Sequence, residues 1–238
     1  MVQNTRGIVL HKTNYSENSI VVQLYTLHFG KLSILVQGAK KKRARSKIAL
    51  FEPLSILELT GNFSNTAKLI RPTEISMFIS LQETHTKISK SLIVLFLSEV
   101  IHKSIKESFP EPDLYIYLEK SLVQLEKTND SIANFHLVFL VGLSRFLGFL
   151  PFKSSGHYFS ISDGVFSNII PSSGLYLKEE EKEIFYSLLD ITLQDCHQLS
   201  LNSVQRKTAL QNVLDYYKVH ISNMGEIKSH HVLETIFQ

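Results

Sequence analysis

The sequence is poor in the residues that cross-link a chain or anchor it in a membrane. Its 238 residues include one cysteine, no tryptophan and six prolines, which excludes an intramolecular disulfide and a cysteine-rich zinc site. A single cysteine also favours a reducing compartment. The longest apolar stretch, residues 135–152, is interrupted by charged and glycine residues. It fits a buried helix better than a membrane span, which needs about 20 apolar residues. With no secretory signal at its start, the chain is expected to be cytoplasmic and to have no membrane partner.

Catalytic signatures are missing as well. The sequence has no Gly-x-Ser-x-Gly elbow, no Gly-x-x-x-x-Gly-Lys-Ser/Thr phosphate loop and no His-Glu-x-x-His pair. Cys196 and His197 have no second ligand pair at the spacing of a zinc site. The acidic triplet 179–181 stands at an expected helix start, where it favours the helix dipole. We therefore predict neither an enzyme nor a metal or cofactor site.

Charge is present, but it is unevenly divided. The whole chain carries a formal net charge of +3. Residues 1–80 hold 11 Lys and Arg against four Glu, a net charge of +7, whereas residues 81–238 hold 14 against 18 acidic residues, a net charge of −4. This asymmetry indicates a basic module that meets a polyanion, joined to an acidic module that does not.

The periodicity of the apolar residues changes at the same point. Up to residue 80 it has the period of two that is typical of strands, with short strands expected at residues 8–10, 20–25, 32–37, 54–59 and 67–71. Five short strands predict a closed five-stranded OB-type barrel, although an open meander or an SH3-like barrel would give much the same pattern. Beyond residue 80 the period becomes helical. Helices are expected over residues 81–109, 113–127, 131–148, 178–189, 203–222 and 229–237.

These patterns predict an α+β protein with two domains. The first is a five-stranded OB-fold domain over residues 1–80, and the second is an all-helical domain over residues 81–238. Residues 152–177, which are rich in Ser and Gly, form an irregular insertion in the second domain with room for one hairpin.

A dense basic run follows the third expected strand. Residues 40–47 place six cations in eight positions, and like charges at this density repel one another until a polyanion neutralises them. On a loop of an OB barrel, such a run is suited to a nucleic-acid backbone. A solvated loop without a partner and a localisation signal are the alternatives. Among the nearby aromatic residues, Phe29 in a turn and Tyr25 are candidates for base stacking, with core packing as the alternative for each.

The N-terminal residues also form a specific ordered set. Gly7-Ile8-Val9-Leu10, Tyr15-Ser16-Glu17, Leu24-Tyr25-Thr26, Gly30-Lys31 and Gly38-Ala39-Lys40 follow one another at close spacing. The set resembles the opening of the bacterial recombination mediator family RecO. Leu147-Gly148-Phe149 and the close of the chain, where Lys228-Ser229 leads into Val232-Leu233-Glu234, are also similar to the family.

The resemblance implies an OB domain followed by a helical domain, and a function in DNA repair and homologous recombination without catalytic turnover. Such proteins bind single- and double-stranded DNA and anneal complementary strands. With RecR they load RecA onto strands coated by the single-stranded DNA-binding protein (SSB), and RecF is a further candidate partner. The implied localisation is the cytoplasm, at the nucleoid. Carried onto this chain, the candidate DNA contacts are Lys40, Lys41, Lys42, Arg43, Arg45 and Lys47, followed by Arg6, Lys12, Lys31, Lys68 and Arg71.

The chain departs from the family pattern in its insertion. Many family members bind zinc there through two cysteine pairs, whereas this insertion has Ser154-Ser155-Gly156 and Ser172-Ser173-Gly174 and no cysteine. The resemblance therefore implies a zinc-less, ribbon-like insertion that is either lost or held by packing through Tyr158, Phe159 and Phe166.

The family's helical domain holds the acidic C-terminal tail of SSB. A candidate groove for that tail lies near Arg145, Phe146 and Phe149, with core packing as the alternative for the aromatic residues. A generic OB-fold RNA-binding protein of translation or RNA metabolism is the second hypothesis for the whole chain, because a barrel and a basic run do not distinguish RNA from DNA.

Overall fold

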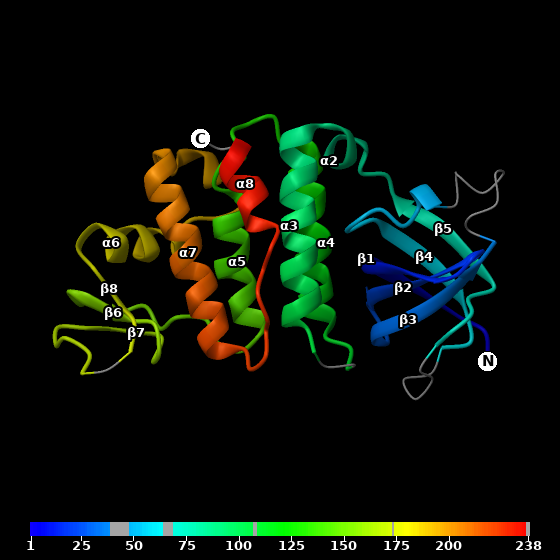
Figure 1. Ribbon diagram of the computed structural model, residues 1–238, viewed down its shortest axis with the longest axis horizontal. Coiled ribbons are helices and arrows are strands. Elements are labelled where there is room, and N and C mark those ends of the chain that lie inside the picture. Colours follow the sequence, from blue (N-terminus) through cyan, green and yellow to red (C-terminus); the bar gives the residue numbers. More distant parts are fainter. Residues whose placement is uncertain (39–47, 64–68, 107–108, 173, 237–238) are drawn as a thin grey trace. The chain divides into compact units, whose positions relative to one another are not determined.

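The computed structural model describes residues 1–38, 48–63, 69–106, 109–172 and 174–236 (Figure 1). The chain divides into two compact units, residues 1–126 and 127–238, which are described separately. The predicted boundary at residue 80 marks the end of the N-terminal sheet, whereas the first compact unit continues through three helices. The chain is a mixed α+β protein, as the sequence predicted.

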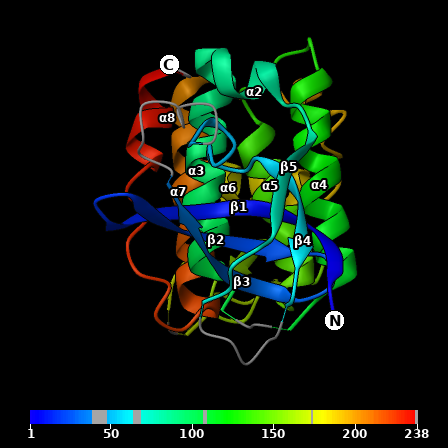
Figure 2. The ribbon, with the colours of Figure 1, turned by 90° about the vertical axis from the view of Figure 1, so that its right-hand side faces the viewer.

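The first unit begins with an antiparallel sheet of five strands. Their order across the sheet is β3-β2-β1-β4-β5 (Figure 2). β1 is long enough to pair with β4 through its first residues and with β2 through the remainder. The strands are β1 (Gln3–Ser16), β2 (Ser19–Thr26), β3 (Gly30–Gln37), β4 (Ile56–Gly61) and β5 (Glu74–Ile79).

The alternation seen in the sequence places every second side chain of β2 and β3 in the core. Val22 and Leu24 of β2 and Ile34 of β3 are completely buried, and Phe51 and Phe63 close the same cluster. Burying one such side chain contributes about 1.5–3 kcal/mol, so this face holds the sheet together.

The sheet is OB-like but does not close into the ring of strands that we predicted. Among the described residues, no ladder joins the edge strands β3 and β5. The chain at Ile70 forms a parallel bridge to Ile34 instead: Ile70 N–H donates to Ser33 O at 2.9 Å, and Leu35 N–H donates to Ile70 O at 2.8 Å.

The strand predicted over residues 67–71 is therefore wrong in its position. In the described part of that range the chain makes the bridge at Ile70, and the last strand of the sheet is β5. Pro72 has no N–H with which to extend pairing along β3. β5 could not be recognised in the sequence because most of its side chains are exposed. Such a strand lacks the alternation of apolar and polar residues that marks a half-buried strand.

Three helices complete the first unit: α2 (Gln82–Thr86), α3 (Ile88–Ser104) and α4 (Pro112–Lys127). α3 packs on β1. Its Ser98 hydroxyl donates to Leu10 O at 2.7 Å, at a position where a bulge interrupts the register between β1 and β2. The helix thus satisfies a carbonyl group at a break in the ladder.

The second unit contains four α-helices in its described residues. It begins with α5 (Phe135–Phe146), whose side chains are largely buried. Asn202 and Gln205 form a reciprocal capping box at the start of α7. Nowhere in the described ranges of the chain is a helix long and apolar enough to cross a membrane. The remaining elements are α6 (Glu179–Leu188), the 3₁₀-helix η2 (Cys196–Gln198), α7 (Ser203–His220) and α8 (His230–Ile236).

The insertion folds into a small sheet of three strands, not into one hairpin. β6 (Tyr158–Ser160) lies between β7 (Val165–Ser167) and β8 (Tyr176–Lys178). Phe159 is completely buried, and its ring centroid lies 4.7 Å from that of Phe166 and 4.5 Å from that of Phe185 on α6. The prediction that aromatic packing holds the insertion is confirmed for Phe159 and Phe166, whereas Tyr158 is half-buried and meets Tyr176 edge-on.

Candidate nucleic-acid interface

The eleven predicted DNA contacts divide into two groups. The basic run, Lys40 to Lys47, and Lys68 lie outside the described residues and stay predictions. The structure describes the other four, Arg6, Lys12, Lys31 and Arg71, and it shows that their surroundings differ.

Arg6 is occupied by partners within its own unit. Its Nη1 donates to both carboxylate oxygens of Glu119 on α4, each at 3.0 Å. The guanidinium carbon also lies 4.8 Å from the ring centroid of Phe78 and 5.7 Å from that of Tyr115. The Glu119 carboxylate and the two aromatic rings thus hold the Arg6 guanidinium between the sheet and α4. Arg6 therefore has a structural role in packing the helix on the sheet.

Lys31 is also occupied, although β3 leaves its side chain partly accessible. The ammonium group donates to the carbonyl oxygens of His102 and Ile105, both at 2.8 Å, at the C-terminal end of α3. A cation is favourable there because the last carbonyls of a helix carry partial negative charge. Burial lowers the pKa of Lys31 from its ordinary value. Lys31 therefore joins α3 to the sheet.

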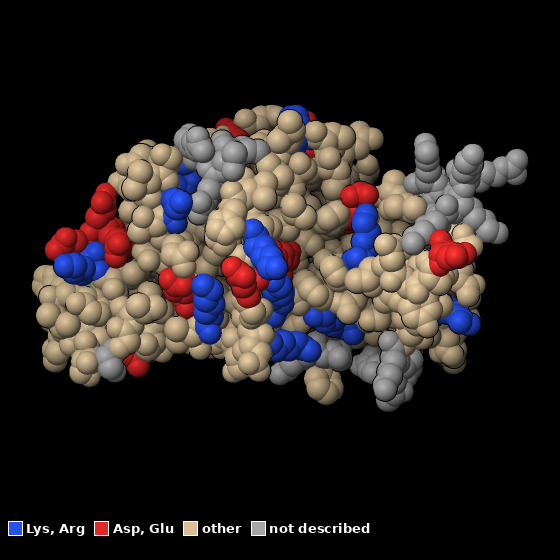
Figure 3. All heavy atoms as spheres, in the orientation of Figure 1, with Lys and Arg blue, Asp and Glu red and all other residues tan. Residues whose placement is uncertain are grey.

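Lys12 and Arg71 keep their charges at the surface. Lys12 Nζ lies 3.2 Å from Glu52 Oε1, and both side chains are exposed, so the pair contributes at most about 1 kcal/mol. Arg71 is exposed in the segment that leads into β5. On the face drawn in Figure 3, the described Lys and Arg side chains around the sheet stand apart instead of forming one continuous basic patch.

The base-stacking role predicted for Tyr25 is wrong. Its side chain is 1% exposed, its hydroxyl accepts a hydrogen bond from Glu111 N–H at 3.1 Å, and burial raises its pKa to about 12. Phe29 is half-buried, and its ring centroid lies 5.0 Å from that of Phe63. It is therefore not the exposed turn residue that we expected. The turn folds Phe29 back because its N–H donates to the Thr26 hydroxyl at 3.1 Å.

Tyr15, near the end of β1, is an exposed aromatic residue that was not among the stacking candidates predicted from the sequence. It is 64% exposed. The sequence signal was available, because Tyr15 stands among polar residues at the turn between two strands. Core packing is a poor explanation for an aromatic residue in such surroundings.

A cavity of about 270 Å³ opens at the C-terminal end of β3, within the first unit. One wall comes from Leu35 to Gln37, a second from Leu50 and Phe51, and a third from Arg71 to Ile75. The volume lies just below the range of about 300–1,000 Å³ that accommodates drug-sized ligands. Arg71 is therefore an exposed cation that lines this cavity.

The groove residues predicted in the second unit have mixed surroundings. Arg145, in the last turn of α5, is exposed, and Phe146 is half-buried. Phe149 stacks on His220 with ring centroids 5.5 Å apart, and it meets Tyr217 edge-on at 5.0 Å. These contacts favour a packing role for Phe149, and the groove for a protein tail stays a prediction.

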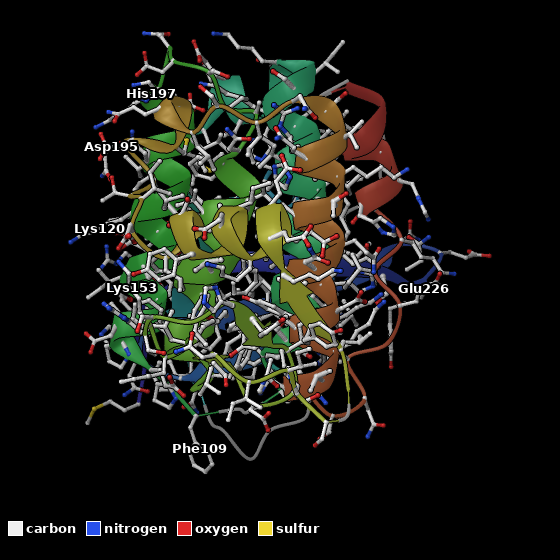
Figure 4. The ribbon with its side chains drawn as sticks, turned by 90° about the vertical axis from the view of Figure 1, so that its left-hand side faces the viewer. Phe109, Lys120, Lys153, Asp195, His197 and Glu226 are labelled. Atoms are coloured by element: carbon white, nitrogen blue, oxygen red, sulfur yellow. The ribbon has the colours of Figure 1, made fainter. Side chains whose placement is uncertain are left out.

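Cys196 and His197 have different surroundings in the second unit. Burial raises the pKa of the Cys196 thiol to about 11, whereas His197, labelled in Figure 4, is exposed and its Nδ1 lies 3.0 Å from Gln194 O. Within the described ranges, no three His, Cys, Asp or Glu side chains come together as metal ligands.

Two family models together span most of the chain. The model for "Recombination protein O N terminal" matches residues 1–78, and the model for "Recombination protein O C terminal" matches residues 85–230. The chain belongs to the RecO family. The resemblance drawn from the sequence is therefore confirmed. RecO proteins serve DNA repair and recombination.

Curated relatives share this similarity over their full length. Each of the following is named DNA repair protein RecO. The relative from Flavobacterium johnsoniae is 36% identical over 98% of both chains. The relatives from Bacteroides fragilis and Phocaeicola vulgatus are 33% and 32% identical over all of both chains.

Proposed function

We propose that this protein is a DNA-binding recombination mediator that acts without catalytic turnover and without a cofactor. It binds single- and double-stranded DNA and anneals complementary strands. With RecR it helps to load RecA onto single strands coated by SSB, whose C-terminal tail it contacts, and RecF is a further partner. Its place is the cytoplasm, at the nucleoid. The observation that carries the proposal is the match to RecO over both compact units.

The charge distribution supports a phosphate-binding role for the first unit. Residues 1–80 carry a net charge of +7, and six of their cations follow one another closely after β3. Because Arg6 and Lys31 are occupied within the unit, we propose the basic run, Lys68 and the exposed cations Lys12 and Arg71 as the groups that contact DNA. Each phosphate contact adds about −0.9 to the slope of log affinity against log salt for duplex DNA and about −0.7 for a single strand.

Neutralising the basic run tests the phosphate site. Replacing Lys40, Lys41, Lys42, Arg43, Arg45 and Lys47 by Gln should weaken binding strongly and flatten the salt slope by several units. Lys178→Gln together with Lys218→Gln, two exposed cations of the second unit, serves as the control and should leave DNA binding unchanged. DNA binding that is insensitive to salt, or that survives the loss of all six charges, would contradict the proposal.

An annealing assay tests the mediator role directly. Complementary strands coated with the cognate SSB should anneal faster when the protein is added, and the six-charge variant should lose this stimulation. Competition between matched RNA and DNA oligonucleotides completes the test. A strong preference for RNA would favour a protein of RNA metabolism over a recombination mediator.

A further inference from the structure

Three strand ends of the first unit meet at one end of the sheet. Ser16 of β1 pairs with Ser19 of β2, and Ser19 pairs with Gln37 of β3. The end of β1, the start of β2 and the end of β3 are therefore neighbours, and Figure 2 shows the β1–β2 turn protruding from the sheet. Neighbouring strands lie about 4.8 Å apart, so the two outer ends are separated by roughly 10 Å.

Tyr15 is presented to solvent at this end. The register between β1 and β2 shifts between Asn14 and Ser16, so Tyr15 is an extra residue in a bulge. A bulge re-aims its side chain away from the regular ladder. Tyr15 is 64% exposed, and within the described residues its side chain has no hydrogen bond or ring contact. Among the residues that the structure describes, none covers its flat aromatic face by such a contact.

The cavity lies at the same end because the chain leaves β3 there. Thr73 N–H and the Thr73 hydroxyl both donate to Thr60 O of β4, at 2.8 and 3.0 Å. These bonds draw the chain toward β4 just after the bridge at Ile70, and Pro72 has no N–H to offer to β3. β3 continues past the bridge to Gln37, and the gap between β3 and the start of β5 is the cavity.

The walls and the rim of this cavity differ in chemistry. Leu35, Leu50 and Ile75 contribute apolar walls, whereas Gln37, Glu74 and Arg71 are exposed polar residues at its edge. A nucleobase combines the same properties, with apolar faces and an edge of hydrogen-bond donors and acceptors. A plain phosphate site is disfavoured because Glu74 lines the cavity together with Arg71.

We infer that this end of the sheet is a subsite for single-stranded DNA, in which the cavity receives one unstacked base, Arg71 holds a neighbouring phosphate and Tyr15 stacks on a second base. The ends of β1 and β3 lie roughly 10 Å apart, about three times the 3.4 Å rise between stacked bases, so the two bases are not adjacent members of one stack. The base in the cavity leaves the stack because apolar walls replace its stacked neighbours. A duplex keeps its bases paired and stacked, and it does not enter. The inference rests on the proposed DNA-binding function and adds which form of DNA this surface selects.

Binding measurements on the full-length protein test the subsite. Fluorescence anisotropy would compare a labelled single strand with a blunt duplex of the same length for the wild type, Tyr15→Ala, Tyr15→Phe and Arg71→Gln. Tyr15→Ala should raise the single-strand Kd about fivefold or more, whereas Tyr15→Phe should bind like the wild type because it retains the ring. Arg71→Gln should reduce the single-strand salt slope by about 0.7. Duplex affinity should change less than about twofold in all three variants.

Tyr176→Ala is the matched control for the loss of an exposed tyrosine, because Tyr176 is 38% exposed on β8 in the second unit. Circular dichroism of each variant checks that the fold is retained. A 2-aminopurine base in the strand should also brighten on binding, because its fluorescence rises when it leaves the stack. Equal single-strand Kd values for Tyr15→Ala and Tyr176→Ala, or equal losses on single strand and duplex, would overturn the subsite.

The outcomes separate this inference from the proposed function. If the wild type binds no DNA, the proposed function itself fails. If the wild type binds DNA and the six-charge variant does not, while Tyr15→Ala and Arg71→Gln bind normally, the function stands and the subsite is wrong.

Discussion

The two sheets of this protein bury their inner faces by different means. The sheet of the first unit has strands of 6 to 14 residues, and it buries a core that is mostly aliphatic, with Phe51 and Phe63 at its border. The sheet of the insertion has three strands of three residues each, which offer too few inward side chains for such a core. It relies on rings instead, because one aromatic side chain buries about 150–250 Å².

The two sheets also differ in their surroundings: the large sheet has a cavity at its edge, whereas the small sheet packs on the helices α6 and α7. In the described residues, the large sheet has a cavity between β3 and the start of β5, beside a core cluster to which β1, β2, β3 and β4 all contribute. The small sheet depends on Phe185 of α6 and Tyr216 of α7, whose ring centroids lie 4.5 and 5.7 Å from that of Phe159. Aromatic packing thus holds an insertion that contains no cysteine.

The sharpest way to test this contrast is to remove the central ring of the small sheet. Phe159→Ala should lower the free energy of unfolding of the second unit by about 3–5 kcal/mol, because the side chain is completely buried. Hydrogen exchange measured by mass spectrometry would report this on peptides from β6 to α7. Phe152→Ala removes a ring that is 70% exposed, and it should change stability by less than about 0.5 kcal/mol. Equal effects of the two substitutions would contradict the role of Phe159.

The second test concerns the cations of the large sheet. Lys31→Met removes both hydrogen bonds to the end of α3 and should lower the free energy of unfolding by roughly 2 kcal/mol. Lys12→Met breaks an exposed ion pair and should cost less than about 1 kcal/mol. Urea unfolding followed by circular dichroism compares the two variants. A stable Lys31→Met protein with weakened DNA binding would show that Lys31 contacts DNA and does not join α3 to the sheet.

The smallest expected effect is a loss of stability of the first unit at acidic pH. Burial, followed by the nearby charges of Lys31 and His11, lowers the pKa of His102 to about 4 from its ordinary value of 6.5. The unfolded chain therefore binds more protons than the folded chain between these two values. The free energy of unfolding should fall as the pH falls from about 6.5 to about 4.

The size of this loss is about 1–2 kcal/mol, because His102 is only half-buried and solvent screens part of its charge. Urea unfolding at pH 7, 5 and 4 should give a shallower decline for His102→Phe, which keeps a ring beside His11, than for the wild type. His197→Gln replaces an exposed histidine and should behave like the wild type. The same decline in His102→Phe as in the wild type would exclude His102 as its source.

Much of the fold could be predicted from local patterns. Alternation located β2 and β3, and helical periodicity together with proline positions located the helices in outline. β5 could not be predicted in this way, because its exposed side chains leave no alternation to recognise. The ordered N-terminal residues also identified the family, and the sequence determined the charge asymmetry and the absence of a cysteine set for zinc.

Only the tertiary structure decided which groups are available for binding. Arg6 and Lys31 look equivalent to Lys12 and Arg71 in the sequence, but their partners Glu119 and His102 lie far along the chain. Tyr25, for which the sequence predicted base stacking, is buried, whereas Tyr15 is exposed. The reason is of the same kind, since burial depends on elements that pack from elsewhere in the chain. A local pattern reports the strand or helix in which a residue lies, whereas its exposure and its pairing depend on contacts that form only when distant segments meet.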